Sequence, residues 1–428
     1  MGRGYIVEEA VESYLSQLCE VKSTTTTGLL IGQSSAQRDY IVMASRTPPK
    51  EDSPGNSLDK DWVTEHARQV SRMLPGGLFV LGVFIITEVD AKDIQATLRQ
   101  LVFSVENLIS SERFWSPADD DVTDCVTLHI NSKTRKTVCR TFDIKDPKSM
   151  AKPADWKYQS AVCSSWVTVS CCLNVNIYFP LPTGPNTPEK IEKCIKDELK
   201  IWAQQIESGV CLLDGKKVPD DVELTTGQRR NAKQAYTVQL LISPCEQQFS
   251  DVVQKCGGSV SIKGAVHCRA YVHGNKPKAK LAERLLKRDI ISMVATRVHM
   301  LLEELMTAEG RNNNFAVELS IPRRIFCPVK GRGPVSVCDY QFSDEGPLEA
   351  TERLKEMLDL DAAEEDIDTT QEITPENINT ETIESKAEII EEKVEDPAPQ
   401  RNNYIGVVMA SAVALLATAA SLLYLTDV

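Results

Sequence analysis

The sequence is poor in the residues from which common hydrolytic and metal sites are built. It contains only 5 histidines in 428 residues, and none falls in an H-x-H or H-E-x-x-H pattern, which argues against the familiar zinc-peptidase motifs. The 13 cysteines are odd in number and scattered, without a C-x-x-C pair, so neither a zinc knuckle nor a thioredoxin-type motif is indicated. We therefore expect reduced thiols and no catalytic residue, metal site or cofactor.

Signals for secretion are also missing. The first ten residues contain no apolar run, so a secretory signal peptide is not indicated. No N-x-Ser or N-x-Thr acceptor for N-glycosylation occurs anywhere in the sequence. Both absences favour a body that lies in the cytosol.

Acidic residues are concentrated in one segment of the chain. The net charge is −13, yet residues 344–400 alone hold 20 acidic and 4 basic residues. The rest is close to neutral and has no recognised nucleic-acid motif, so nucleic acid is not an expected partner. Apolar residues become sparse beyond residue 360, and we expect the chain to be disordered from there to residue 400.

The longest apolar run lies near the C-terminal end. Residues 404–425 carry no charge and would reach roughly 33 Å as a helix, enough for the ~30 Å hydrocarbon layer of a bilayer. Only three residues follow, so we expect a tail anchor that is inserted after synthesis and leaves the body on the cytosolic side. The predicted span includes Tyr404, Gly406, Leu415, Leu416 and Leu425.

Strand-like and helix-like patterns follow one another through the body and predict an α+β protein. The continuous apolar run at 78–86 predicts a strand that is buried on both faces. The strict alternation at 167–179 predicts a half-exposed strand. Pro188 is typical of a first helical position, and a long helix is expected at 277–306.

The stretch from 259 to 272 is considered as a possible catalytic site. It is expected to form two strands, 259–262 and 265–272, on either side of Lys263-Gly264. His267 beside Cys268 suggests a thiol nucleophile with its base, but adjacent residues of a strand point to opposite faces. We therefore expect both to be ordinary strand residues.

Two groups of residues are candidates for contact with a partner. The first could present aromatic rings to a partner, with packing in the core as the alternative. The second is a set of basic residues that lie close together at the start of the long helix, where positive charges oppose the helix dipole. It could form a basic dock for an acidic partner, an anionic lipid or the chain's own acidic segment, with a solvated face as the alternative. The candidates are Trp156, Lys157 and Tyr158 in the first group and Lys278, Arg284, Lys287 and Arg288 in the second.

Several stretches resemble the odorant-response-abnormal family, the group named from its fourth member. Among them DPKS…PADWKYQS is long and unusual, and the likeness covers most of residues 1–345 together with the apolar C-terminal run. The matching stretches are TGLLIGQ at 27–33, RTPPK at 46–50, EHARQVSRMLPGG at 65–77, DPKSMAKPADWKYQS at 146–160, residues 258–278 and CDYQF at 338–342.

The resemblance implies a single-pass protein of the endoplasmic reticulum membrane. Members of the family assist the folding or trafficking of odorant receptors and other G-protein-coupled receptors. They also recruit the cysteine protease that is specific for the ubiquitin-fold modifier. We expect an MPN-like domain at 1–181, a second, smaller α+β domain at 182–345, a largely disordered acidic tether at 346–403 and the anchor at 404–425.

The MPN fold is that of the JAMM isopeptidases, whose zinc ligands follow a G-x-x-H-x-H pattern at the end of a buried strand. Gly82 begins this pattern, but Ile85 and Thr87 occupy the two histidine positions. The serine and aspartate positions fall near Gln95 and Leu98, and none of the four supplies a working ligand. The resemblance therefore implies a pseudo-enzyme that serves as a tail-anchored adaptor; the alternative is an active membrane-bound peptidase of unrecognised type.

Overall fold

The computed structural model describes residues 3–20, 25–50, 58–181, 183, 188–224, 234–242, 256–307 and 315–372. All of them belong to one compact unit, Met1–Ile373. Within these ranges no helix is both long enough and apolar enough to cross a membrane. The predicted anchor, with Tyr404, Gly406, Leu415, Leu416 and Leu425, lies outside the described residues.

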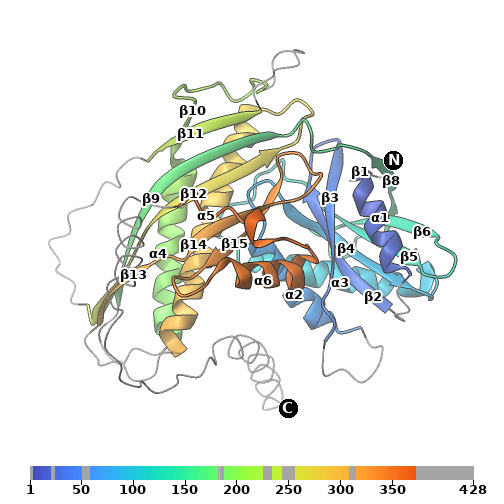
Figure 1. Cartoon of the computed structure of the whole chain (residues 1–428), viewed down its shortest axis with the longest axis horizontal. Coiled ribbons are helices and arrows are strands. Elements are labelled where there is room, and N and C mark those ends of the chain that lie inside the picture. The colour runs from blue at the N-terminus through green and yellow to red at the C-terminus, as the bar shows by residue number, and fades with distance from the viewer. Residues whose placement is uncertain are drawn as a thin grey trace, which may run out of the picture. The chain divides into compact units, whose positions relative to one another are not determined.

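Two sheets and a hairpin carry the fold (Figure 1), which is mixed α+β as predicted. The first sheet has the strand order β7-β6-β5-β4-β2-β3-β1-β8 and the second has the order β10-β11-β9-β12-β13. The strands of the first sheet are β1 (Gly4–Glu8), β2 (Thr25–Gln33), β3 (Arg38–Arg46), β4 (Phe79–Thr87), β5 (Asp124–Asn131), β6 (Thr137–Asp143), β7 (Lys152–Pro153) and β8 (Asp155–Gln159). Those of the second are β9 (Val167–Leu181), β10 (Val210–Leu213), β11 (Ala235–Leu241), β12 (Gly258–Val272) and β13 (Phe315–Ser320), and the hairpin is formed by β14 (Arg323–Pro328) and β15 (Ser336–Gln341).

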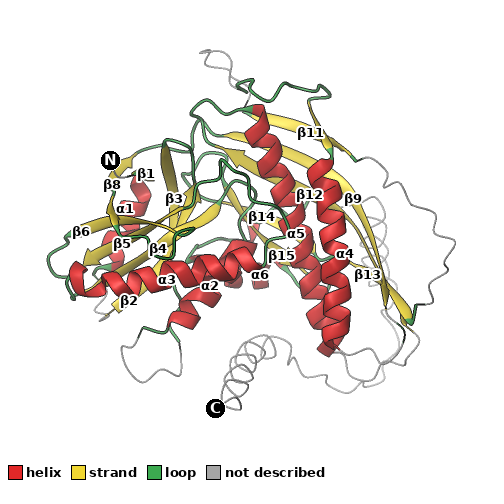
Figure 2. Cartoon of the chain, turned by 180° about the vertical axis from the view of Figure 1, so that it is seen from behind, coloured by secondary structure: helices red, strands yellow, loops and turns green. Residues whose placement is uncertain are grey.

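Helices bury the apolar faces of both sheets. One face of the first sheet packs against α1, and the other packs against α2, α3 and α6. The second sheet packs one face against α4 and α5, which run across its long strands (Figure 2). The helices are α1 (Glu9–Leu18), α2 (Lys60–Arg72), α3 (Ala91–Ser111), α4 (Pro188–Ser208), α5 (Ala279–Thr307) and α6 (Pro347–Leu358).

The two strands with the clearest sequence patterns are confirmed. In β4 the neighbours Phe84 and Ile85 are both fully buried, the first in the core under α1 and the second in the core under α2 and α3. This is what a strand with both faces covered requires. In β9 the alternate residues from Val167 to Phe179 lie in or against the core under α4 and α5, while Asn174 and Asn176 are exposed.

The predicted break at Lys263-Gly264 is wrong. Strand β12 is continuous and pairs antiparallel with β9 from Gly258 to Val272. A Cβ atom at Gly264 would lie 2.4 Å from Cγ1 of Ile321. The glycine therefore permits close packing of the chain after β13, whereas the sequence interpretation assigned it to a turn.

The edges of the first sheet are occupied by one segment, residues 152–159. Its first part, β7, pairs with β6, and its second part, β8, pairs in parallel with β1. Ala154 separates the two strands and donates its backbone N–H to Cys139 O at 3.2 Å. Because only Ala154 lies between β7 and β8, this one segment brings the two ends of the strand order together.

A glycine turn after α2 joins the two sheets. The backbone N–H of Gly76 donates to Arg269 O, and the N–H of Tyr271 donates to Gly76 O at 2.8 Å. Gln33, which is buried on β2, donates from Nε2 to both Gly77 O and Tyr271 O at 2.7 Å. Gly77 has φ +83°, which favours glycine. These bonds tie the first sheet to β12.

The chain after α6 forms a strap, which we define as residues 359–372, and which corrects the expected onset of disorder at residue 360. The backbones of Asp368 and Phe326 exchange two hydrogen bonds, at 2.8 and 3.1 Å. Ile367 is 9% exposed and Glu372 is 6% exposed. An acidic composition favours disorder, but composition alone does not show that the carboxylate of Glu372 is buried and paired inside the fold.

Removing the hydroxyl group that docks the start of the strap should weaken the fold slightly. Tyr14 Oη on α1 donates to Asp359 Oδ2 and accepts from Arg46 N, both at 2.9 Å. We expect Tyr14→Phe to lower the free energy of unfolding by about 1 kcal/mol, the usual contribution of a hydrogen bond. Urea titration measures this effect. Tyr178→Phe, at an exposed ring, is the control, and an equal loss in both variants would contradict the docking role.

Candidate functional site

The predicted aromatic partner residues lie on β8, at an edge of the first sheet. Trp156 and Tyr158 are half-buried and pack against the core under α1, and their rings meet edge to face at 6.2 Å. Lys157 between them is exposed. The aromatic rings therefore serve packing in this structure, and a partner contact at Lys157 stays a prediction.

The predicted basic group lies at the start of α5, where each cation contacts acids or carbonyl groups of the body. Arg284 pairs with Asp120, and Arg288 forms a two-point pair with Asp121 at 2.6 and 3.0 Å. Lys278, at the helix start, pairs with Asp221 at 2.9 Å. These acids lie outside the helix, so no local sequence pattern indicates the pairs.

Lys287 has a capping role in addition to its pair with Glu283. Its Nζ donates to Glu207 O at 2.9 Å and to Gly209 O at 2.6 Å, where α4 ends. A cation at a helix C-terminus interacts favourably with the helix dipole. The basic group thus links α5 to α4 and to the loop after α3, and its contact with a separate partner remains a prediction.

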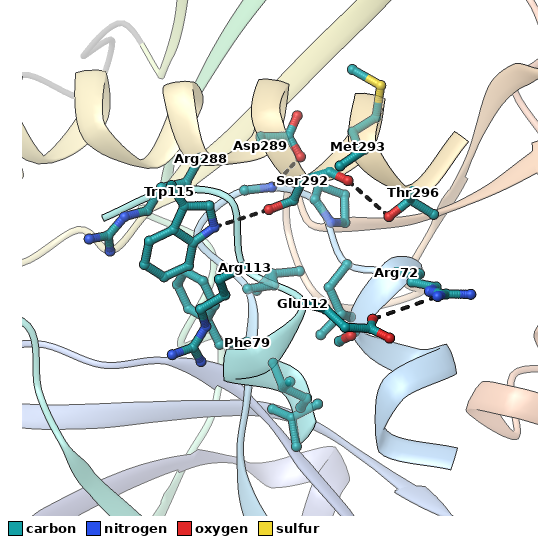
Figure 3. A pocket seen from close by; sticks show the side chains of 18 of the residues that line it. Arg72, Phe79, Glu112, Arg113, Trp115, Arg288, Asp289, Ser292, Met293 and Thr296 are labelled. Atoms are coloured by element: carbon teal, nitrogen blue, oxygen red, sulfur yellow. Dashed lines mark hydrogen bonds and ion pairs between the residues drawn. The ribbon is translucent and has the colours of Figure 1, made fainter. Parts of the chain in front are cut away.

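The loop after α3 is bound to α5 around Trp115 (Figure 3). Trp115 Nε1 donates to Ser292 Oγ at 3.1 Å, and the guanidinium groups of Arg113 and Arg288 lie 5.1 and 4.0 Å from the centre of its ring. Burial by itself would raise the pKa of Asp121, but the hydrogen bond and charge of Arg288 bring that pKa below its usual value.

A cavity of about 110 Å³ lies next to this loop. Its arginines are compensated by acids: Arg72 lies 3.6 Å from Glu112, and Arg113 lies 2.8 Å from Glu106. The volume is below the roughly 300–1,000 Å³ typical of pockets for small-molecule ligands. The cavity lies where α2, β4 and the loop after α3 meet α5. Among the residues that line it are Arg72, Gly76, Phe79, Glu112, Trp115, Arg288, Ser292, Thr296 and His299.

The positions that correspond to JAMM zinc ligands lie on β4 and α3. Ile85 is in the core, and Thr87 is buried at the end of the strand, with its hydroxyl 3.5 Å from that of Thr25. Gln95 is half-buried and Leu98 is buried on α3. In the part of the chain that the structure describes, no group of three or more His, Cys, Asp or Glu side chains could hold a metal ion.

Two buried ion pairs hold the strap, the hairpin and α5 together. Glu372 accepts hydrogen bonds from both terminal nitrogens of Arg297 at 2.7 Å. It also accepts from the backbone nitrogens of Arg324 and His267, at 2.6 and 2.7 Å. We call this arrangement the Glu372 clamp. In the second pair Asp289 accepts hydrogen bonds from both terminal nitrogens of Arg324. Its carboxylate also accepts a hydrogen bond from the backbone N–H of Gly76 at 2.9 Å.

His267 does not pair with its neighbour Cys268, in agreement with the alternation expected for a strand. Cys268 is fully buried on the side of α4 and α5. The partner of His267 is instead Cys172 on β9, in register with it across the sheet, with Sγ 3.2 Å from Nδ1. Sequence reasoning missed this contact, which depends on the pairing of strands 95 residues apart.

Comparison with known proteins identifies the family. The model of the family described as odorant response abnormal 4-like matches residues 28–369. The chain belongs to this family. It is 45% identical to "Protein odr-4 homolog" of Gallus gallus and 42% identical to the Homo sapiens protein of that name, over the whole length of both partners. The match to "Odorant response abnormal protein 4" of Caenorhabditis elegans has 19% identity over 82% of this chain and 76% of that protein.

The family match extends further along the chain than residue 345, where the likeness described in the sequence analysis ends. It includes α6 and the strap as far as residue 369, three residues before the Glu372 clamp. A crystal structure described as UfSP from C. elegans superposes with a TM-score of 0.43 and 9% identity, over 85% of this chain and 57% of that one. A score of this size does not establish a shared fold, so the MPN-like assignment stays a prediction.

Proposed function

We propose that this chain is a tail-anchored adaptor of the endoplasmic reticulum membrane that assists the folding and trafficking of odorant and other G-protein-coupled receptors. The observation that carries the proposal is the family relationship, which reaches a protein named for an abnormal odorant response. The apolar run at 404–425 supports attachment to a membrane. A role in receptor trafficking requires contact with clients and no chemistry on them.

The arrangement of the body suits an adaptor. The glycine turn after α2 and the loop around Trp115 hold the two sheets together. The Glu372 clamp then fixes the last described part of the chain. Only 31 residues separate Glu372 from Tyr404, and a flexible linker of that length spans roughly 30 Å. The body would therefore work close to the membrane.

A second partner of the proposed adaptor is the cysteine protease specific for the ubiquitin-fold modifier, held by this chain at the same membrane. The proposal rests on the family resemblance. The candidates for its contact surface are the exposed Lys157 and the cations at the start of α5. The cations of α5 already pair with acids of the body, so a partner that binds Arg288 would have to compete with Asp121.

Removing the apolar run should abolish the function and leave the body folded. In cells that lack the native protein, we expect the full chain to restore a tagged odorant receptor to the surface. A chain that ends before Tyr404 should not, because it loses its place at the membrane. The matched control replaces residues 404–425 by an unrelated tail anchor of equal length and should restore the receptor.

Full rescue by the truncated chain would refute the tethered adaptor. Thermal unfolding of the truncated protein checks that its body is intact. Hydrolysis of a peptide by the purified body, lost on chelation of metal, would instead support the membrane-bound peptidase.

A further inference from the structure

Residues 133–157 carry an excess of positive charge. They hold eight basic and three acidic residues, in a chain whose net charge is −13. They include β6, β7 and part of β8, on the side of the body opposite β13 (Figure 1). Several of their lysines are exposed and form no ion pair with a described residue, whereas the predicted cations of α5 are paired. These lysines are Lys136, Lys145, Lys148, Lys152 and Lys157.

Three of these lysines lie close to an exposed apolar side chain, in the loop between β6 and β7 and at the start of β7. Met150 is 82% exposed, more than any other large apolar side chain that the structure describes. It stands midway between Lys148 and Lys152 in the sequence, and Lys152 is fixed opposite Thr141 in the sheet. We define the basic edge as Lys145, Lys148, Met150 and Lys152.

The loop that carries the basic edge is fixed to the body. Ser149 is 6% exposed, and its hydroxyl accepts from the backbone N–H of Asp143 at 2.9 Å. Its own N–H donates to Asp146 O at 2.8 Å. From α3, Arg99 donates to the carbonyl oxygens of Pro147 and Ser149. The guanidinium group of Arg99 therefore adds a positive charge next to the loop.

The two aspartates of the loop bind backbone donors. Asp143 accepts from Thr123 Oγ1 at 2.8 Å and from the backbone N–H of Lys145 at 3.1 Å. Asp146 accepts from the backbone N–H of Lys148 at 2.9 Å. Neither carboxylate pairs with a lysine ammonium group in the part of the chain that the structure describes. The ammonium groups of the basic edge are therefore available to an anion outside the body.

We propose that the basic edge docks the body on an anionic lipid surface, with Met150 entering the headgroup region. The inference rests on the proposed membrane anchor, because the apolar run at 404–425 would keep a bilayer within reach. A lysine near an anionic bilayer raises the binding constant by roughly fivefold. Three lysines bind weakly by themselves, but the tether makes the contact intramolecular, so that weak contacts suffice.

The apolar side chain favours a lipid surface over an acidic protein. Because Met150 is mostly exposed, it gains little from packing in the body and can be buried elsewhere. At a membrane surface, apolar side chains enter the boundary between headgroups and acyl chains, while neighbouring cations face anionic headgroups. The basic edge provides both kinds of contact on one short loop and the strand that follows it.

The test compares lysines within one molecule. The full chain is combined with vesicles of phosphatidylcholine alone or of phosphatidylcholine with phosphatidylserine, and an amine-reactive reagent labels its lysines. Peptide mass mapping gives the rate at each one. We expect Lys145, Lys148 and Lys152 to react roughly fivefold more slowly on the anionic vesicles, and added salt should remove the difference. The exposed Lys193 and Lys200, which lie among acids on α4, should react equally on both.

Flotation of the same vesicles separates this inference from the proposed anchor. A chain that floats with both kinds of vesicle but shows no slower labelling would overturn the docking role and leave the anchor standing. A chain that floats with neither would contradict the anchor and this inference with it. Flotation with the anionic vesicles alone would support the basic edge and contradict the anchor. Slower labelling caused by an acidic peptide, but not by phosphatidylserine, would assign the surface to a protein partner and overturn the proposal.

A variant then tests the three lysines through the methionine. Lys145→Gln, Lys148→Gln and Lys152→Gln are combined, and the oxidation of Met150 by hydrogen peroxide is followed by mass mapping. In the native chain we expect oxidation to be roughly fivefold slower on the anionic vesicles than on phosphatidylcholine. In the triple variant the two rates should be equal. Protection of Met150 that persists in the variant would refute the role of these lysines.

The matched control removes the same charge from another surface. Lys193→Gln, Lys196→Gln and Lys200→Gln are combined on α4, where all three side chains are exposed. This variant should keep the slow oxidation of Met150 on anionic vesicles. An equal loss of protection in both triple variants would show that only the net charge matters and would overturn the assignment to the basic edge.

Discussion

Replacing Glu372 by Gln is expected to lower the free energy of unfolding by roughly 3–5 kcal/mol, the usual cost of removing one partner from a buried ion pair. Arg297 is fully buried, and its terminal nitrogens both donate to Glu372. A neutral amide would leave the guanidinium charge uncompensated. It would also place an NH₂ group against donors, among them the N–H of Arg324 at 2.6 Å. Urea unfolding followed by circular dichroism measures the loss.

The control lies in the same acidic segment. Glu365 is exposed, so Glu365→Gln should change the free energy of unfolding by no more than about 0.5 kcal/mol. The double variant Arg297→Met with Glu372→Gln should recover part of the loss, because it removes the unpaired charge. A stability of Glu372→Gln equal to that of Glu365→Gln would mean that the strap contributes nothing to the fold.

Acidification from pH 7 to pH 5 is expected to lower the free energy of unfolding by roughly 4 kcal/mol through two histidines. Burial lowers the pKa of both His66 and His267 to about 4, whereas an unfolded histidine has a pKa of about 6.5. Between these values the unfolded chain binds more protons. The stability is therefore fully present above pH 6.5 and is lost as the pH falls toward 4.

The other histidines act in the same direction, since burial also lowers the pKa of His129, His273 and His299. Asp39 and Asp339 act in the opposite direction, because burial raises the pKa of each. Urea midpoints at half-unit steps from pH 8 to pH 5 test the balance. His66→Gln should reduce the slope below pH 6.5 by about 1.4 kcal/mol per unit. A constant stability from pH 7 to pH 5 would contradict the prediction.

Hydrophobic periodicity was sufficient to predict the elements in which buried side chains recur at the regular spacing of a strand or a helix. The run at 78–86 and the alternation at 167–179 correspond to β4 and β9, and Pro188 does begin α4. Strands β1 and β8 were not predicted, although they are paired in the first sheet. Their partners lie far away in the sequence, Gly4 opposite Asp155 for example, and a five-residue strand has too few positions to show a pattern.

The candidate site was harder to predict, because its contacts join residues that look ordinary in sequence. Glu372 is one of many glutamates in an acidic segment, and only the fold places it beside Arg297. Cys172 and His267 meet because β9 and β12 pair in one register. The cations at the start of α5 stand close together in the sequence, but Asp120 and Asp121, which pair with Arg284 and Arg288, belong to a loop more than 150 residues earlier.

The segment at 152–159 has a consequence for how the protein behaves at high concentration. Unpaired strand edges invite strands of other molecules to add to a sheet, which leads to aggregation. Here the outermost strands are only two and five residues long. They carry Lys152, Pro153, Asp155 and Lys157, all exposed, and lysine and proline at an edge disfavour such addition. The first sheet thus offers little open backbone to a second copy, which favours a body that resists self-association.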